Sequence, residues 1–111
     1  MKLEDIWFHD CRLVRIVEIP ASDLLAFEVT YPIDWYAGEW GPKTILFTEV
    51  LNYEVREGPY QGAPSMLSYS TEPDGERTRL TIETTAGRRT LSFLGVSLLD
   101  GHHVAPDAAS D

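Results

Sequence analysis

The chain has 111 residues and a formal net charge of −9, from 18 acidic and 9 basic side chains. This length fits one domain, and the single cysteine excludes an internal disulfide and a multi-cysteine zinc motif. The acidic balance argues against a nucleic-acid binder, because contacts to phosphates need a basic surface.

Alternating apolar and polar residues predict strands along most of the chain. Residues 13–19 are apolar on both faces, so we expect a strand in the middle of a sheet, whereas residues 24–31 alternate strictly, as in a strand with one buried face. Residues 44–56 are long for one strand, so a bend or bulge is expected near Glu49 or Asn52.

Turn residues divide the second half of the chain. Strands are expected at residues 66–71, 78–85 and 90–99. Residues 72–76 contain Pro-Asp-Gly and form the strongest hairpin signal, and residues 85–88 form a second one, so the last three strands should make an antiparallel meander. Gly95 suggests a bulge or a close backbone approach.

Two longer connections, residues 32–43 and 58–65, are irregular by composition. The expected fold is therefore all-β, with about six mainly antiparallel strands that form a small barrel or sandwich with little helix. Residues 1–100 make one domain, and residues 101–111 make a flexible acidic tail. Acids interrupt the N-terminal apolar residues and no apolar run could span a membrane, so we expect a cytoplasmic protein.

Three chemically versatile residues stand side by side at His9, Asp10 and Cys11. A Cys–His pair can activate a thiolate, with an acid to orient the imidazole. In a strand, however, Asp10 would point away from the other two side chains. We therefore favour a structural interpretation, in which Cys11 is a small core residue and His9 bonds a backbone carbonyl.

The aromatic-rich segment at residues 31–42 is the main candidate binding site, with candidate residues Asp34, Trp35, Tyr36, Glu39 and Trp40, joined by His9. Exposed aromatic rings are typical of interfaces, and they can also stack on sugar rings. The acids could attract a basic partner. Alternatively, the tryptophans fold back as a lid over one end of the sheet, and one residue can serve both roles.

Four basic residues gather near the second hairpin: Arg77, Arg79, Arg88 and Arg89. We expect them to neutralise nearby acids across strands rather than to bind phosphate. Those acids are Glu72, Glu76 and Glu83.

Two adjacent histidines, His102 and His103, stand at the start of the predicted tail. Adjacent histidines bind metal weakly, and stable zinc sites need three or four protein ligands. We therefore expect neither a metal nor a cofactor.

Residues 7–13, Trp-Phe-His-Asp-Cys-Arg-Leu, resemble the W-x-H-D-[CS]-x-L start of small bacterial all-β proteins. Residues 50–59, a strand followed at once by Gly-Pro, look like part of the same pattern. Most of these proteins have no known function, and some are assigned as immunity proteins that neutralise polymorphic toxins. The resemblance implies a compact bacterial β domain with a binding role and carries over no catalytic residues.

The leading prediction is a non-catalytic protein that acts by protein–protein binding, of which an immunity-type inhibitor is one concrete form. The alternative is a small-molecule-binding β-barrel, and in that case an enzyme is conceivable, with its pocket near Trp35, Trp40 and His9. A third prediction is self-association through the edges of a sheet. Neither nucleic acid nor membrane is expected as a partner.

Overall fold

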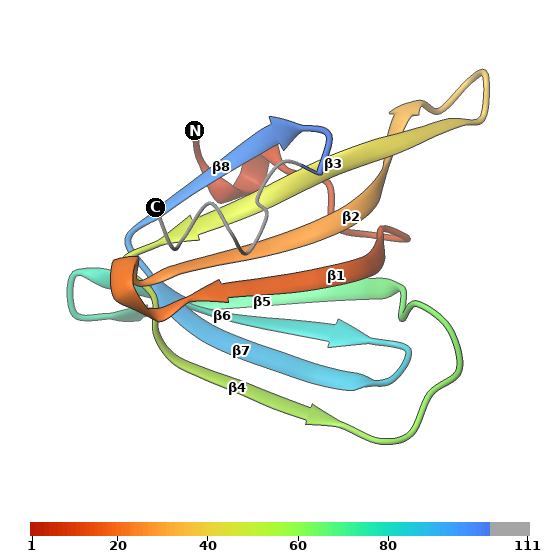
Figure 1. Ribbon diagram of the computed structural model, residues 1–111. Helices are drawn as coiled ribbons and strands as arrows, with labels where there is room; N and C mark the ends of the chain where they lie inside the picture. Colours follow the sequence, from red (N-terminus) through yellow and green to blue (C-terminus); the bar gives the residue numbers. More distant parts are fainter. Residues whose placement is uncertain (103–111) are drawn as a thin grey trace.

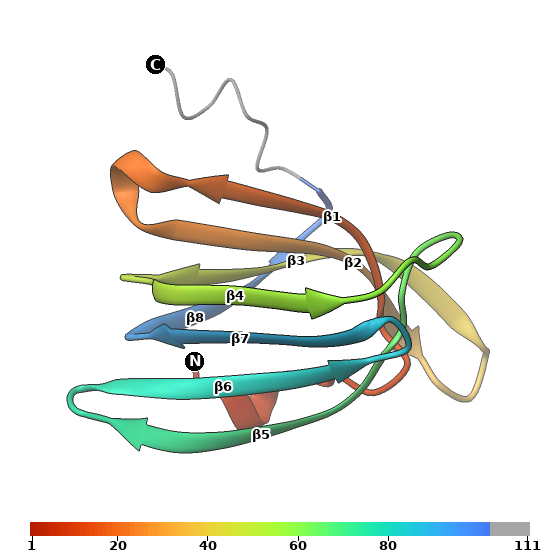
Figure 2. The ribbon, with the colours of Figure 1, turned by 90° about the horizontal axis from the view of Figure 1, so that it is seen from below.

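The structure is a computed structural model that describes residues 1–102, and it is a β-sandwich of two four-stranded antiparallel sheets (Figure 1). The strand order is β1-β2-β3-β8 in the first sheet and β4-β7-β6-β5 in the second. Figure 2 shows the second sheet in front of the first. The all-β prediction is confirmed. Of the two predicted architectures, the structure is the sandwich and not a closed barrel, and it has eight strands instead of six.

The first sheet contains β1 (Arg12–Ile19), β2 (Leu24–Asp34), β3 (Glu39–Thr48) and β8 (Gly95–Asp100). The second contains β4 (Leu51–Glu57), β5 (Met66–Asp74), β6 (Arg77–Thr84) and β7 (Gly87–Phe93). Two short 3-10 turns complete the fold, η1 (Leu3–Asp5) and η2 (Pro20–Ser22). Within residues 1–102, no helix is long and apolar enough to cross a membrane.

The count rises to eight because two predicted strands each divide where the chain crosses between the sheets. Residues 44–56 divide into β3 and β4 at Glu49, whose φ of 52° bends the backbone near the predicted place. Residues 90–99 divide into β7 and β8 at Leu94. Gly95 makes a close contact with the side chain of Thr48, not with a backbone segment. A Cβ at position 95 would lie 2.5 Å from Oγ1 of Thr48.

The antiparallel meander is confirmed for β5, β6 and β7. The second half of the last predicted strand is β8, which lies in the first sheet. The prediction of a central first strand is wrong, because β1 lies at a sheet edge. Both of its faces nevertheless carry buried side chains. Leu13 packs in the core between the sheets, while Val17 and Ile19 pack with Ala26 in a smaller cluster.

Residues 32–43, predicted to be irregular, instead continue β2 and β3 as a hairpin. Cross-strand pairs Tyr31↔Gly41, Pro32↔Trp40 and Asp34↔Glu39 extend the ladder. Proline, glycine and aspartate favour loops, but they are also tolerated near the end of a twisted hairpin, so composition alone predicted the wrong structure here. Residues 58–65, by contrast, form no strand, as predicted.

The core between the sheets is rich in phenylalanine. The ring of Phe47 lies edge-on to Phe27 at 5.3 Å and to Phe93 at 5.0 Å, measured between centroids. The N-terminal segment adds three buried side chains, Leu3, Ile6 and Phe8, to the same core. These contacts tie the start of the chain to both sheets and so determine where its exposed residues lie.

Candidate functional site

The hairpin of β2 and β3 extends beyond the ends of the other strands (Figure 1). One carboxylate oxygen of Asp34 accepts hydrogen bonds from the backbone N–H groups of Tyr36 (3.0 Å) and Ala37 (3.1 Å). Gly38 completes the turn with a φ of 67°, a conformation that glycine adopts at low cost. The turn is therefore held locally, and Tyr36 stands fully exposed at its tip.

Three tryptophans form a row near the turn end of this hairpin. Trp35 lies edge-on to Trp7 at 5.6 Å and edge-on to Trp40 at 5.5 Å. Trp7, Trp35 and Trp40 are 46%, 51% and 40% exposed, so they do not close over the core as a lid. We call the exposed apolar side chains here the aromatic patch: Trp7, Ile33, Trp35, Tyr36 and Trp40.

Trp7 is a member of the patch that sequence reasoning missed. Its backbone N–H donates to the hydroxyl of Tyr31 at 2.8 Å, which joins the N-terminal segment to β2. His9 lies next to it, with 6.4 Å between the two ring centroids. The W-x-H motif was the only sequence signal for this placement, and it gave no indication of contact with the hairpin.

The residues at 9–11 form a turn and not a strand. Asp10 has a φ of 66°, and one of its carboxylate oxygens lies 3.4 Å from Nε2 of His9. The expectation that these side chains point apart is therefore wrong, because it assumed strand geometry. His9 Nδ1 lies 2.8 Å from the carbonyl oxygen of Leu67, as the structural interpretation expected.

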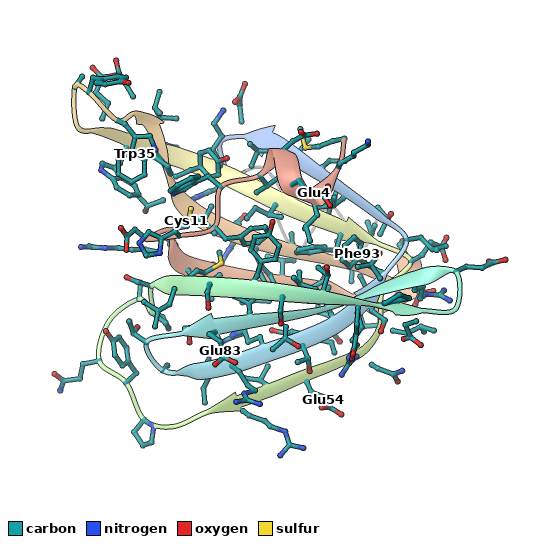
Figure 3. All side chains as sticks on the ribbon, turned by 180° about the vertical axis from the view of Figure 1, so that it is seen from behind. Glu4, Cys11, Trp35, Glu54, Glu83 and Phe93 are labelled. Carbon is teal, nitrogen blue, oxygen red and sulfur yellow. The ribbon has the colours of Figure 1, made fainter. Side chains whose placement is uncertain are left out.

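Cys11 is fully buried in the core, below the segment that carries Trp35 in Figure 3. Its thiol donates to the carbonyl oxygen of Trp7 at 3.1 Å. Burial, with a smaller contribution from the negative charge of Asp10, raises the pKa of the thiol from 9.0 to about 12. A protonated, enclosed thiol is a poor nucleophile, so the geometry favours a core role over a catalytic one.

A cavity of about 480 Å³ opens beside the aromatic patch. It is lined by Asp10, Arg12, Thr30, Trp40 and Ser65, and we call it the Trp40 cavity. Strand pairing assembles it, since Arg12 pairs with Thr30 of β2 and bridges to Ser65. Of these residues, only Asp10 and Trp40 were singled out from the sequence, because the others become neighbours only through the strand register.

The remaining predicted binding residues lie at the hairpin. Asp34 has a structural role in the turn through one carboxylate oxygen. Glu39 is exposed where β3 begins. Asp10, Asp34 and Glu39 therefore place three carboxylates on or beside the aromatic patch.

The basic cluster is engaged in ion pairs and hydrogen bonds. Arg88 lies 3.6 Å from the predicted Glu83, while Arg89 pairs with Glu57 at 2.5 Å. Arg79 lies 3.8 Å from Glu54, and Arg77 donates to the carbonyl oxygen of Glu49. Glu54 and Glu57 were not anticipated, because β4 was expected to continue β3 and instead lies beside β7.

The histidine pair is described only in part. His102 Nε2 lies 2.9 Å from the carbonyl oxygen of Val29, and His103 lies outside the described residues, as do the remaining residues of the predicted tail. Up to residue 102, no three His, Cys, Asp or Glu side chains come together as a metal site. Comparison with protein-family models, curated proteins and solved structures gave no match for this chain.

Proposed function

We propose that this protein is a non-catalytic binding protein that docks another protein on the aromatic patch. The observation that supports this proposal is a row of three half-exposed tryptophans beside a fully exposed Tyr36. Contiguous exposed apolar patches are uncommon on soluble monomers and mark interaction sites. Tryptophan and tyrosine are also the residues that most often dominate the binding energy of an interface.

The charge of the chain favours a basic partner. The net charge is −9, and Asp10, Asp34 and Glu39 lie on or beside the patch. Complementary charge speeds association and selects against acidic competitors, while buried aromatic anchors slow dissociation. An inhibitor of a basic toxin, as in immunity proteins, is one concrete form of this function.

Capture experiments test the proposal. The tagged wild-type protein should retain a basic protein from its native cells, and the Trp35→Ala/Tyr36→Ala variant should lose it. Tyr60→Ala is the matched control, because it removes a half-exposed aromatic side chain from the 58–65 loop. Retention should also fall as salt rises. Capture of no partner, or equal capture by the double variant, would contradict the proposal.

A second candidate function is the binding of a small ligand in the Trp40 cavity. The observation that favours it is a cavity whose lining joins the exposed Trp40 to four polar residues. Small-molecule sites combine such an apolar wall with a few placed polar groups. Saturable binding of a small molecule that Trp40→Ala weakens, with Tyr60→Ala as the unaffected control, would support this candidate.

A further inference from the structure

We infer that the Trp40 cavity binds the ring of a neutral sugar, an inference that rests on the second candidate function. The cavity joins an aromatic wall, Trp40, to a donor, Arg12, and an acceptor, Asp10. Thr30 and Ser65, which both carry a hydroxyl group, line the same cavity. This combination matches the chemistry of a pyranose ring, which is apolar on its C–H faces and polar at its rim.

The opposite charges of the polar lining favour an uncharged ligand. A guanidinium only donates hydrogen bonds, and a carboxylate only accepts them, whereas each sugar hydroxyl does both. A simple anion at Arg12 would also meet the negative charge of Asp10, and a simple cation at Asp10 would meet Arg12. Neighbouring hydroxyls of one sugar can satisfy both groups at once.

Arg12 is available for such a contact. Its side chain is exposed and, as far as the chain is described, it makes no ion pair or hydrogen bond. Strand pairing fixes its backbone between Thr30 and Ser65. The guanidinium of Arg12 is therefore placed at the cavity by β1, and no neighbouring side chain accepts its hydrogen bonds within the described residues.

The indole of Trp40 is partly exposed and packed against a second aromatic ring. It is 40% exposed, and it packs against Trp35 in a T-shaped arrangement with an angle of 74° between the two rings. The C–H groups of a sugar face carry partial positive charge and are attracted to the negative face of an aromatic ring. A cavity of about 480 Å³ lies within the usual range for small-ligand sites, which leaves room for a mono- or disaccharide.

Titration of the isotopically labelled protein with maltose, cellobiose and diacetylchitobiose, followed by NMR, tests the inference. At least one disaccharide should bind saturably, with a Kd on the order of 1 mM, and should shift the signals of Arg12, Ser65 and the Trp40 indole. Trp40→Ala should weaken binding at least about tenfold. Arg12→Gln gives a second variant on an exposed side chain, where misfolding is not a concern.

Tyr60→Ala should bind the disaccharide as the wild type does. The inference is overturned if none of the three disaccharides binds, or if binding survives both Trp40→Ala and Arg12→Gln. Phosphate and glycinamide serve as anionic and cationic comparison probes. If either binds in the cavity and no sugar does, the sugar inference fails while the second candidate function stands. Protein capture by Arg12→Gln should remain intact, which separates this test from that of the aromatic patch.

Discussion

The ion pair between Glu57 and Arg89 allows a sharp test of the packing between β4 and β7. Arg89 Nη2 lies 2.5 Å from one carboxylate oxygen of Glu57, and its Nε lies 2.9 Å from the other. The same guanidinium donates to the hydroxyl of Tyr53 at 2.6 Å, and the hydroxyl of Thr84 donates to Glu57 at 3.2 Å. Replacement of Glu57 by glutamine removes the negative charge and places amide N–H groups against the guanidinium.

We expect Glu57→Gln to lower the free energy of unfolding by about 2–3 kcal/mol. Breaking a fully buried pair costs about 3–5 kcal/mol, because one charge is left without its partner. The side chains of Arg89 and Glu57 remain 15% and 11% exposed, and Tyr53 still accepts from Arg89, so the cost should be smaller. Against a total stability of about 5–15 kcal/mol, such a loss is readily measured.

Urea denaturation, extrapolated linearly to water, measures the loss. Glu83→Gln is the matched control, because its partner Arg88 lies 3.6 Å away and both side chains are about half exposed. That control should change stability by less than about 0.5 kcal/mol. The reasoning would be refuted by equal losses in the two variants, or if Glu57→Leu/Arg89→Met, which removes both charges, were as unstable as Glu57→Gln.

Two further predictions concern Cys11 and Gly87. The folded protein should not react with a thiol reagent at neutral pH. Between about pH 9 and pH 12, Cys11 should lower the free energy of unfolding by up to about 1.4 kcal/mol per pH unit, because the thiolate forms first in the unfolded chain. Cys11→Ala should have a slope that is smaller by this amount, with the raised pKa of Tyr53 accounting for part of the slope that remains, and an equal slope in the two proteins would contradict the argument. In Gly87→Ala, the new Cβ would lie 2.1 Å from the carbonyl oxygen of Arg56, so thermal unfolding should show a loss of about 2–4 kcal/mol, whereas Gly58→Ala, which meets open space, should cost less than about 1 kcal/mol. Equal losses in the two glycine variants would contradict that reading.

The fold class was predictable from the sequence because periodicity is a local property. Residues 24–31 lie in β2, and residues 78–84 lie in β6. Only β6 has the single buried face that alternation predicts, because Ala26 and Glu28 on the second face of β2 are buried as well. The sequence indicated irregular backbone near Glu49 and Gly95, but it did not predict that the chain changes sheet at these places. Leu94 interrupts a run with good strand propensity, and only contact with Thr48, whose carbonyl oxygen accepts from Leu94, marks the change of sheet.

Only the part of the candidate site that is local in the sequence could be predicted. Trp35 and Trp40 stood out because they are close in the sequence and bounded by turn residues. Trp7, Arg12 and Ser65 reach the site through pairing between distant segments, which no local pattern encodes. Self-association through edge strands stays a prediction, which light scattering on the purified protein can test.

The segment around His9 explains why sequence reasoning could not separate a structural from a functional role. Buried and exposed side chains are interspersed in it: Ile6, Phe8 and Cys11 enter the core, whereas Trp7 and His9 face solvent. The buried set fixes the backbone, and the exposed set is thereby held against the hairpin. Substitution of a buried member would therefore disturb the aromatic patch as well as the core, so loss of binding after such a change says nothing about direct contact. Only variants of the exposed set can distinguish the two roles.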